Sequence, residues 1–582
     1  MGRGPGSTAR RTGLGERWRA RLAARARPGG PVAWPEPRVA GDPARGRQLL
    51  KGRFRIGREL LEAPDRSIWD LAPEEPEALA LHGFGWLDDL LSVGEAPGRA
   101  KAQAWTADWL ARHVGGTGAG WVPELSAERL IRLLGHSRTL LHPPGVGEER
   151  LARAVAAEAR FLEGGWRRAG AGRPRVTALS ALIQAGLALP GRRPLVTRAT
   201  QALAQEAGQV IDAEGGTATR NPEELLEVMA LLVGANQALV AADLPPDPRV
   251  GAAIARGAPT LRALRHADGG LARFHGGCRG PEGRLDQVLA AAGRPSMPLG
   301  KPGLPLHMGY LRLAAGRTTV IVDAGPPPTG AASVAGHAST LAFELTSGRR
   351  PLVVSMGAGR SFGERWRRAA RATASHSTLS LDMVSSARLG LPLPGEEGAR
   401  IAEGPGRVLV ETGVLDGGPR AELAQDGWRG SHGLTHARIL ALSPDGRRLA
   451  GEDMLTTLTA ADGEAFDRAI DGSNRLGIAF ALRFHLHPDV EAATDGRGDV
   501  AILLKSGEEW VFSHDGEGLL SVEDSVYLEE GRLRPRPTLQ IVLAGRAIRR
   551  HTQLRWTLAK GYGTPEGLRD LNPRTDWDEE DE

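Results

Sequence analysis

Two histidines in short polar turns are the first candidates for chemistry. His337 lies in "AGHAST" and His376 in "RATASHSTLSLD", each at the margin of a stretch with a strand-like pattern. Two imidazoles brought together could bind a divalent metal if a carboxylate joined them, and Asp323 and Asp382 are the nearest carboxylates in the sequence. Each histidine could instead be a turn residue whose ring bonds a backbone carbonyl. The sequence therefore leaves two interpretations open, a divalent-metal site with an incomplete ligand set and a structural role.

The stretch "DAEGGTATRNPEELLE" places Arg220 and Asn221 at the start of an expected helix. The first turn of a helix has free N–H groups and a positive potential, so the guanidinium and the amide could hold an anion such as a uronate carboxylate there. Plain capping of the helix by Asn221, which needs no ligand, explains the same residues. Both interpretations are retained.

Arg371 belongs to an arginine-rich segment, "ERWRRAARATASH", that also contains Trp366. Guanidinium groups that pass over a cleft could bind carboxylates or sulfates in a forked geometry, and the tryptophan could stack on a sugar ring. A solvated basic face is the alternative. Tyr310, in "LHMGYLRLAAG", has a phenol that could deliver a proton, although a tyrosine on a strand usually serves packing.

The elements that must position these residues change character along the chain. From about residue 75 to 290 the apolar spacing is helical, as in "NPEELLEVMALLVGANQALVAA", where Leu225, Met229, Leu232 and Leu239 share one face. Similar segments recur, separated by turns that contain glycine or proline. This pattern predicts a series of helical hairpins that either stack into an open array or curl into a ring with a central cleft.

After the Pro- and Gly-rich stretch "GRPSMPLGKPGLPLH" the apolar period becomes two. Runs such as "TTVIVDAG", "TLAFELTSGRRPLVV" and "TLQIVLAG" are typical of antiparallel hairpins, and without crossover helices such strands pack sheet on sheet. We therefore predict a helical domain over residues 46–295 and an antiparallel β-sandwich over residues 296–560. A mobile basic segment, 1–45, and an acidic tail, 561–582, are expected at the two ends.

Composition and charge restrict which partners and which cellular compartment the protein is expected to have. The 582 residues carry a formal charge of +5, but the sequence contains no DNA- or RNA-binding signature and only three tyrosines to stack on bases, which argues against a nucleic-acid partner. No apolar run approaches the length of a membrane span, so no integral membrane segment is expected. The single cysteine, Cys278, excludes an intramolecular disulfide and a cysteine-rich metal site. The start has no readable signal peptide, which favours the cytoplasm, and the oligomeric state is not indicated.

Most of the chain resembles the heparinase II/III family of polysaccharide lyases. The best local match is "GYLRLAAGRTTVIVDAGPPPTGAASVAGHASTLAFELTSGRRPLVVSMG", followed by "RRAARATASHSTLSLD". The resemblance implies an N-terminal (α/α) toroid, which is an incomplete helical barrel, followed by an antiparallel β-sandwich. It implies cleavage of uronic-acid polysaccharides by β-elimination, with Arg220 and Asn221 neutralising the substrate carboxylate. It also implies that His337 and His376 match two zinc ligands, and it places such proteins in the periplasm or cell envelope.

The sequence departs from the family pattern at several of these positions. Ala335 stands where a further histidine is usual, and Ser355 stands near the place of an expected aspartate. In the segment after Asn221, where active lyases of the family have a Tyr-His pair, this sequence has Glu223 and Glu224. Tyr310 lies after the helical half rather than within it. Two hypotheses follow. The protein is a lyase that acts on an acidic polysaccharide, or it is a catalytically degraded carbohydrate-binding or scaffold protein of the same fold.

Overall fold

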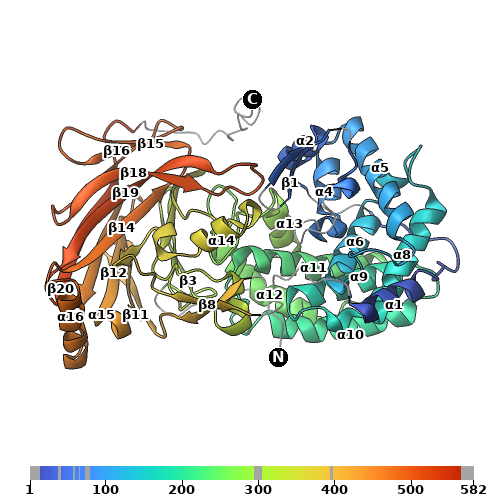
Figure 1. Cartoon of the computed structure of the whole chain (residues 1–582), viewed down its shortest axis with the longest axis horizontal. Coiled ribbons are helices and arrows are strands. Elements are labelled where there is room, and N and C mark those ends of the chain that lie inside the picture. Colours follow the sequence, from blue (N-terminus) through green and yellow to red (C-terminus); the bar gives the residue numbers. More distant parts are fainter. Residues whose placement is uncertain are drawn as a thin grey trace.

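A computed structural model describes residues 13–36, 41–56, 59–64, 66–71, 79–293, 304–393 and 398–564. The helical half and the strand-rich half lie side by side, with the chain passing once from the first to the second (Figure 1). This order of a helical region and then antiparallel sheets confirms the predicted fold class.

The helical half is built from consecutive helices that pack as hairpins. Proline occupies the first or second position of α2, α5, α6, α9, α10, α11 and α12, where its missing N–H costs no helical hydrogen bond. Helix α9 packs on α6, α10 and α11, and α12 packs on α10 and α11. The helices are α1 (Leu14–Ala23), α2 (Pro43–Leu50), α4 (Gly85–Ser92), α5 (Ala96–His113), α6 (Pro123–Gly135), α7 (Ser137–Leu141), α8 (Glu148–Glu163), α9 (Arg173–Ala188), α10 (Arg193–Val210), α11 (Pro222–Ala241), α12 (Pro248–Ala263) and α13 (Arg284–Ala291).

Helix α11 is long and apolar enough to cross a membrane when judged by length and composition alone, and it is the one such helix in the described ranges. It packs on α9, α12 and α13, and its residues Leu225, Met229 and Leu232 are buried in the core of the helical domain. The core helix of a soluble domain passes the same test.

The second half contains two antiparallel sheets of eight strands each among the described residues. The first sheet has the order β18 (Leu519–Tyr527), β19 (Arg536–Ala547), β14 (Ile478–Leu486), β6 (Arg350–Val354), β5 (Phe343–Ser347), β4 (Thr318–Asp323) and β3 (Tyr310–Ala315), with β7 (Leu379–Leu381) also paired to β14. The second sheet has the order β10 (Val408–Leu415), β11 (Gly418–Trp428), β12 (Leu434–Leu442), β13 (Arg448–Thr456), β20 (His551–Lys560), β17 (Glu509–His514), β16 (Val500–Leu504) and β15 (Val490–Thr494).

Aromatic side chains join the two sheets face to face. Phe343 and Phe484 come from the first sheet, and Phe512 and Trp556 come from the second. The ring centroids of Phe484 and Trp556 are 4.7 Å apart, and those of Phe484 and Phe512 are 4.8 Å apart. These contacts, with alternating buried positions along each strand, form the core of a β-sandwich.

The N-terminal prediction needs a correction. Residues 14–23, inside the segment expected to be mobile, form helix α1, because Ala20 and Ala23 are buried against the helical domain, where α1 contacts α8. Residues 1–12 and 37–40 of the expected basic segment, and residues 565–582 of the expected acidic tail, lie outside the described residues. The helical half also contains an unpredicted hairpin of β1 (Arg53–Ile56) and β2 (Glu59–Glu62).

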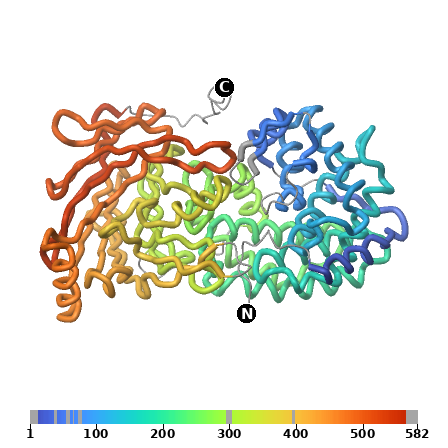
Figure 2. Tube along the Cα trace, viewed as in Figure 1, coloured from blue at the N-terminus to red at the C-terminus, as the bar shows by residue number. Residues whose placement is uncertain are grey.

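A loop of the sandwich reaches back to the start of the helical half. Figure 2 shows the turn between β18 and β19 extending toward α2. There, Gln48 Nε2 donates to the carbonyl of Gly531 at 3.2 Å, and an Arg45 guanidinium nitrogen lies 3.6 Å from a Glu530 carboxylate oxygen. The two halves therefore touch here, between α2 and the turn that joins β18 to β19.

Candidate functional site

The cleft between the two halves has a volume of about 2430 Å³ and is lined by both of them. The helical half contributes Asn221, Glu223, Glu224, Asp268, Arg273 and Cys278 to its wall. The sandwich half contributes His337, Arg360, Arg371, His487, Tyr527 and Glu530. Of the six residues singled out from the sequence, Asn221, His337 and Arg371 line this cleft, whereas Arg220, Tyr310 and His376 do not, so the six do not form one open site.

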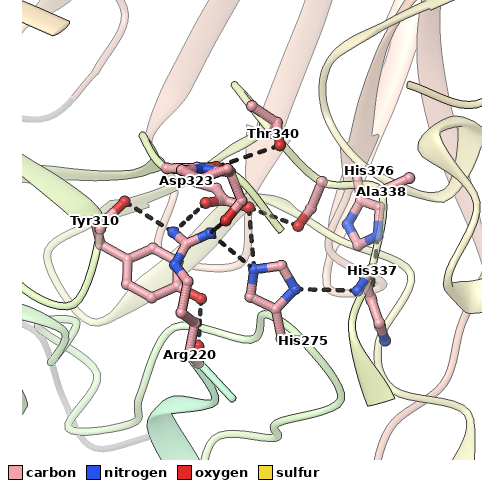
Figure 3. A network of polar contacts seen from close by, with 12 residues as sticks. Arg220, His275, Tyr310, Asp323, His337, Ala338, Thr340 and His376 are labelled. Carbon is pink, nitrogen blue, oxygen red and sulfur yellow. Dashed lines mark hydrogen bonds and ion pairs between the residues drawn. The ribbon is translucent and has the colours of Figure 1, made fainter. Parts of the chain in front are cut away.

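Arg220 is absent from the cleft wall, and Figure 3 shows its guanidinium directed toward Asp323 of the first sheet. Its backbone lies in the left-handed region, with φ of 52°, which turns the side chain out of the start of α11. The guanidinium donates to the carbonyls of Met308 at 3.0 Å, Pro326 at 2.6 Å and Gly309 at 2.9 Å. It also lies 2.5 Å from a carboxylate oxygen of Asp323. The side chain thus joins the helical half to the first sheet.

Asp323 is the buried anion at the centre of this network. Its second carboxylate oxygen accepts from Ser339 Oγ at 2.7 Å and lies 3.4 Å from His275 Nε2. Burial alone would raise the pKa of Asp323, but attraction to Arg220 and His275, with hydrogen bonds from His275 and Ser339, lowers it well below the usual range. His275 Nδ1 accepts the backbone N–H of His337 at 3.0 Å, so this ring is a further contact between the helical half and the sandwich half.

Tyr310 belongs to the same network. Its hydroxyl donates to the backbone carbonyl of Arg220 at 2.6 Å, and the Arg220 guanidinium lies over its ring at 4.7 Å. Burial raises the pKa of the phenol well above its ordinary value. Tyr310 is absent from the cleft wall, and this placement matches the packing role that the sequence had left open.

Asn221 caps α11, as one of the two sequence interpretations expected. Its side-chain oxygen accepts from the backbone N–H groups of Glu223 at 2.9 Å and Glu224 at 3.2 Å. Gly277 packs so closely on this amide that an added Cβ would lie 2.4 Å from the asparagine oxygen. The amide nitrogen makes no hydrogen bond to another described residue, and Asn221 lies in the cleft wall.

His337 and His376 lie together. Their Nδ1 and Nε2 atoms are 3.2 Å apart, and His376 Nδ1 lies 3.0 Å from the hydroxyl of Ser355. Burial lowers the pKa of His376 to about 3 and that of His337 well below its ordinary value, so both rings are neutral. Within the described ranges, no group of three His, Cys, Asp or Glu side chains could hold a metal ion. Two imidazoles and a serine do not fit a structural zinc site, which needs four strong ligands.

Arg371 holds loops of the sandwich rather than an anion. Its guanidinium donates to the carbonyls of Gly336 at 2.7 Å, Ala399 at 2.8 Å and Ser333 at 2.9 Å. Burial, with the nearby Arg367, lowers the pKa of Arg371 to about 10. The side chain is buried, so it is not part of a solvated basic face either.

Sequence reasoning missed three cleft residues that come from separate elements. Arg273 lies in the loop after α12, His487 follows β14, and Tyr527 ends β18. His487 lies two residues after His485, but only the ring of His487 lines the cleft, whereas the ring of His485 bonds Ser525 and Ala374. No pattern marks Arg273 or Tyr527, because only the fold brings them to the cleft.

The cleft also contains a group of carboxylates paired with arginines. Glu223 lies 2.9 Å from Arg360, and Glu227 lies 3.0 Å from Arg173. Burial, opposed mainly by Arg173, raises the pKa of Glu224 to about 7. These pairs leave the middle of the cleft nearly balanced in charge.

Comparison with known proteins agrees with this architecture. Residues 299–557 match the family described as Heparinase II/III-like, C-terminal. The chain is 32% identical over 563 residues to FtsZ-localized protein C of Caulobacter vibrioides, which covers 92% of this chain and 91% of that protein.

Solved structures show the same fold at low sequence identity. Heparinase III superposes with a TM-score of 0.62 at 14% identity, over 93% of this chain and 88% of that one. A mutant of a heparan sulfate lyase from Pedobacter heparinus gives a TM-score of 0.54 at 12% identity, over 94% of this chain and 88% of that one. With the helical half, the two stacked sheets and the matched C-terminal region, these relatives establish that the chain belongs to the heparinase II/III-like family.

Proposed function

We propose that this protein binds a carboxylate-bearing polysaccharide in the cleft without cleaving it. One observation carries the proposal: the arginines and the tyrosine expected to act on a substrate already use their polar atoms inside the protein. Arg220 and Tyr310 bond each other and the first sheet, and Arg371 bonds three backbone carbonyls. The cleft itself remains large, with a volume of about 2430 Å³, and charged side chains form part of its wall.

β-Elimination needs a group that neutralises the carboxylate, a base that removes the adjacent proton and an acid that protonates the leaving oxygen. To neutralise a substrate, Arg220 would have to leave Asp323, and breaking a buried pair costs about 3–5 kcal/mol. Asn221 is the neutralising candidate that still lines the cleft, and its amide nitrogen makes no hydrogen bond to another described residue.

Proton transfer is the weaker part of a lyase mechanism here. His337 faces the cleft, but burial and the neighbouring His376 and His275 hold its pKa well below the ordinary value. A general base works best when its pKa lies near the ambient pH, so this imidazole is a poor proton acceptor. Tyr310 lies outside the cleft wall and cannot act as the acid there.

A lyase assay combined with a binding assay tests the proposal. The purified full chain is incubated with heparan sulfate, hyaluronate and alginate while the absorbance of unsaturated uronate is followed, with an active heparinase III as positive control. We expect no product from any polysaccharide and saturable binding to at least one. Steady product formation, or a lack of binding to all three, would overturn the proposal.

The similarity to FtsZ-localized protein C supports a second, separate proposal, that this protein localises with FtsZ. The supporting observation is 32% identity over nearly the whole of both chains. The test is microscopy of a fluorescent fusion in its own cell together with labelled FtsZ. Coincident positions are expected, and a fusion that is stable and spread evenly through the cell would contradict the proposal.

A further inference from the structure

A second group of an arginine, a histidine and a tyrosine lies in the cleft, apart from the Arg220 network. Arg273, His487 and Tyr527 are 7%, 8% and 4% exposed, and all three line the cleft. Arg273 comes from the helical half, whereas the other two come from the first sheet of the sandwich. The group therefore exists only where the two halves meet.

The polar atoms of these side chains have unused hydrogen-bonding capacity. The hydroxyl of Tyr527 makes no hydrogen bond to any described residue, and its ring contacts that of His487 with centroids 5.3 Å apart. His487 Nδ1 accepts the backbone N–H of Asp489 at 3.2 Å, which places the proton of the neutral ring on Nε2. That Nε2–H group has no partner among the described residues.

Arg273 is held in place by contacts that leave most of its five donors free. Its backbone N–H donates to Glu344 at 3.2 Å, which fixes the loop on β5. Its guanidinium lies 3.5 Å from Glu344 and 3.8 Å from Asp268, longer than the 2.7–2.9 Å of a strong charge-assisted bond.

Each neighbouring carboxylate has a partner besides Arg273. Glu344 lies 3.0 Å from His266, and Glu529 lies 2.9 Å from Arg536. Asp268 also lies 3.8 Å from Arg279. An added anion would therefore meet a cation and two neutral donors rather than an unbalanced negative surface.

Protonation states agree with a site that donates. Burial raises the pKa of Tyr527, despite the nearby Arg273, so the phenol keeps its proton. Burial also lowers the pKa of His487 to about 3, so the imidazole stays neutral with its Nε2–H in place. Burial works to lower the pKa of Arg273, but Tyr527 and Glu344 raise it, so the guanidinium is charged.

We propose that Arg273, His487 and Tyr527 form a binding site for a single carboxylate, the uronate group of the polysaccharide held in the cleft. A planar carboxylate can accept two bonds from one guanidinium and further bonds from a phenol and an imidazole. The inference rests on the proposed function and assigns the carboxylate to residues other than Asn221 and Arg220.

The probe for this site is a saturated hyaluronan hexasaccharide, compared with the same hexasaccharide after its carboxylates are reduced to alcohols. Titration calorimetry of the full chain gives the Kd of each. Tyr527→Phe removes the hydroxyl and keeps the ring, so we expect about a tenfold weaker Kd for the carboxylated probe and no change for the reduced one. Arg273→Lys, which keeps the charge without the fork, is expected to show a loss of the same kind.

Tyr562→Phe is the matched control, because Tyr562 is a fully exposed tyrosine that lies outside the cleft wall. Wild-type binding that Tyr527→Phe and Arg273→Lys both leave unchanged would overturn this site while the proposed function stands. A wild-type chain that binds none of the three probes, namely the hexasaccharide, heparan sulfate and alginate, would overturn the proposed function itself. Melting temperatures of all variants show whether any loss of binding reflects unfolding.

Discussion

Two groups of the same residue types meet at the boundary between the helical half and the sandwich, and they differ in how fully their donors are used. Arg220 lies within bonding distance of four acceptors, which are three carbonyls and Asp323. Arg273 makes one long side-chain hydrogen bond, to Glu344. The tyrosines differ in the same way, since Tyr310 donates to a buried carbonyl whereas the hydroxyl of Tyr527 has no described partner.

The difference separates a structural contact from a binding site. We call the network of Arg220, His275, Tyr310 and Asp323 the joint, because it connects the helical half to the first sheet. A buried charge is stabilising only when its hydrogen bonds are complete, so a saturated guanidinium holds the fold together and has nothing left for a ligand. A guanidinium in a cleft wall with spare donors can exchange water for a ligand at little cost. The loop after α12 serves both groups, because His275 reaches the joint and Arg273, two residues earlier, reaches the cleft.

The largest effect on stability is expected from the centre of the joint. Asp323→Asn removes the charge and leaves Arg220 buried without its anion, so the free energy of unfolding should fall by about 3–5 kcal/mol. Urea denaturation followed by tryptophan fluorescence measures the change. Asp467→Asn breaks the exposed pair with Arg550 and should leave the free energy of unfolding nearly unchanged. Equal losses in the two variants would show that the joint is no stronger than a surface pair.

Acid should weaken the sandwich through its buried histidines before it affects Asp323. The pKa of His376 is about 3 in the folded protein against about 6.5 in the unfolded chain, so the unfolded chain binds a proton that the fold excludes. The free energy of unfolding therefore falls as the pH drops below about 6.5, by up to about 1.4 kcal/mol per pH unit for one histidine. Asp323 has a lowered pKa, so its contribution is present above about 3.8 and is lost only below that pH.

The variant His376→Gln tests this assignment. Urea denaturation at pH 7, 6 and 5 gives the slope of stability against pH, which should be less steep in the variant than in the wild type whatever their difference at pH 7. His514→Gln is the matched control, because His514 is not among the buried residues. An unchanged slope in His376→Gln would mean that folding does not lower the pKa of this ring.

The two tyrosines give a smaller but more direct comparison. Tyr310→Phe leaves the buried carbonyl of Arg220 without its donor and should cost about 1–3 kcal/mol. Tyr527→Phe loses no internal hydrogen bond and should leave the free energy of unfolding within about 0.5 kcal/mol of the wild type. Thermal and urea unfolding of both variants measure this. A destabilised Tyr527→Phe would show that the phenol contributes to stability, and the Arg273 group would then be structural like the Arg220 network.

The sequence predicted the fold because its apolar period changes once, from that of helices to that of strands. Helix α11 starts at Pro222 with Asn221 as its cap, and β4 and β5 coincide with the apolar runs quoted for them. The helix α1 was missed because its sequence reads as a basic end, and only packing against α8 explains its buried alanines.

The site was harder to predict because it depends on contacts between residues far apart in the chain. The hypothesis that His337 and His376 meet, although 39 residues apart, came from their similar places in short polar turns at strand margins. The pairing of Arg220 with Asp323, about a hundred residues later, could not, so an arginine that seemed free for a substrate is internal. Tyr527 reaches the cleft only because β18 and β19 fold back toward the helical half, which no local pattern records.

The smallest expected effect, none at all, concerns the histidine pair beside the joint. If His337 and His376 act as a neutral hydrogen-bonded pair rather than as zinc ligands, neither a chelator nor added zinc should move the melting temperature of the purified chain. A structural zinc site contributes folding free energy outright, so its removal would lower the melting temperature by many degrees. Scanning calorimetry with EDTA, with zinc and with neither, alongside metal analysis, distinguishes the two. A melting temperature that falls with EDTA and returns with zinc would mean that the two imidazoles recruit ligands other than Ser355, and the joint would then include a metal.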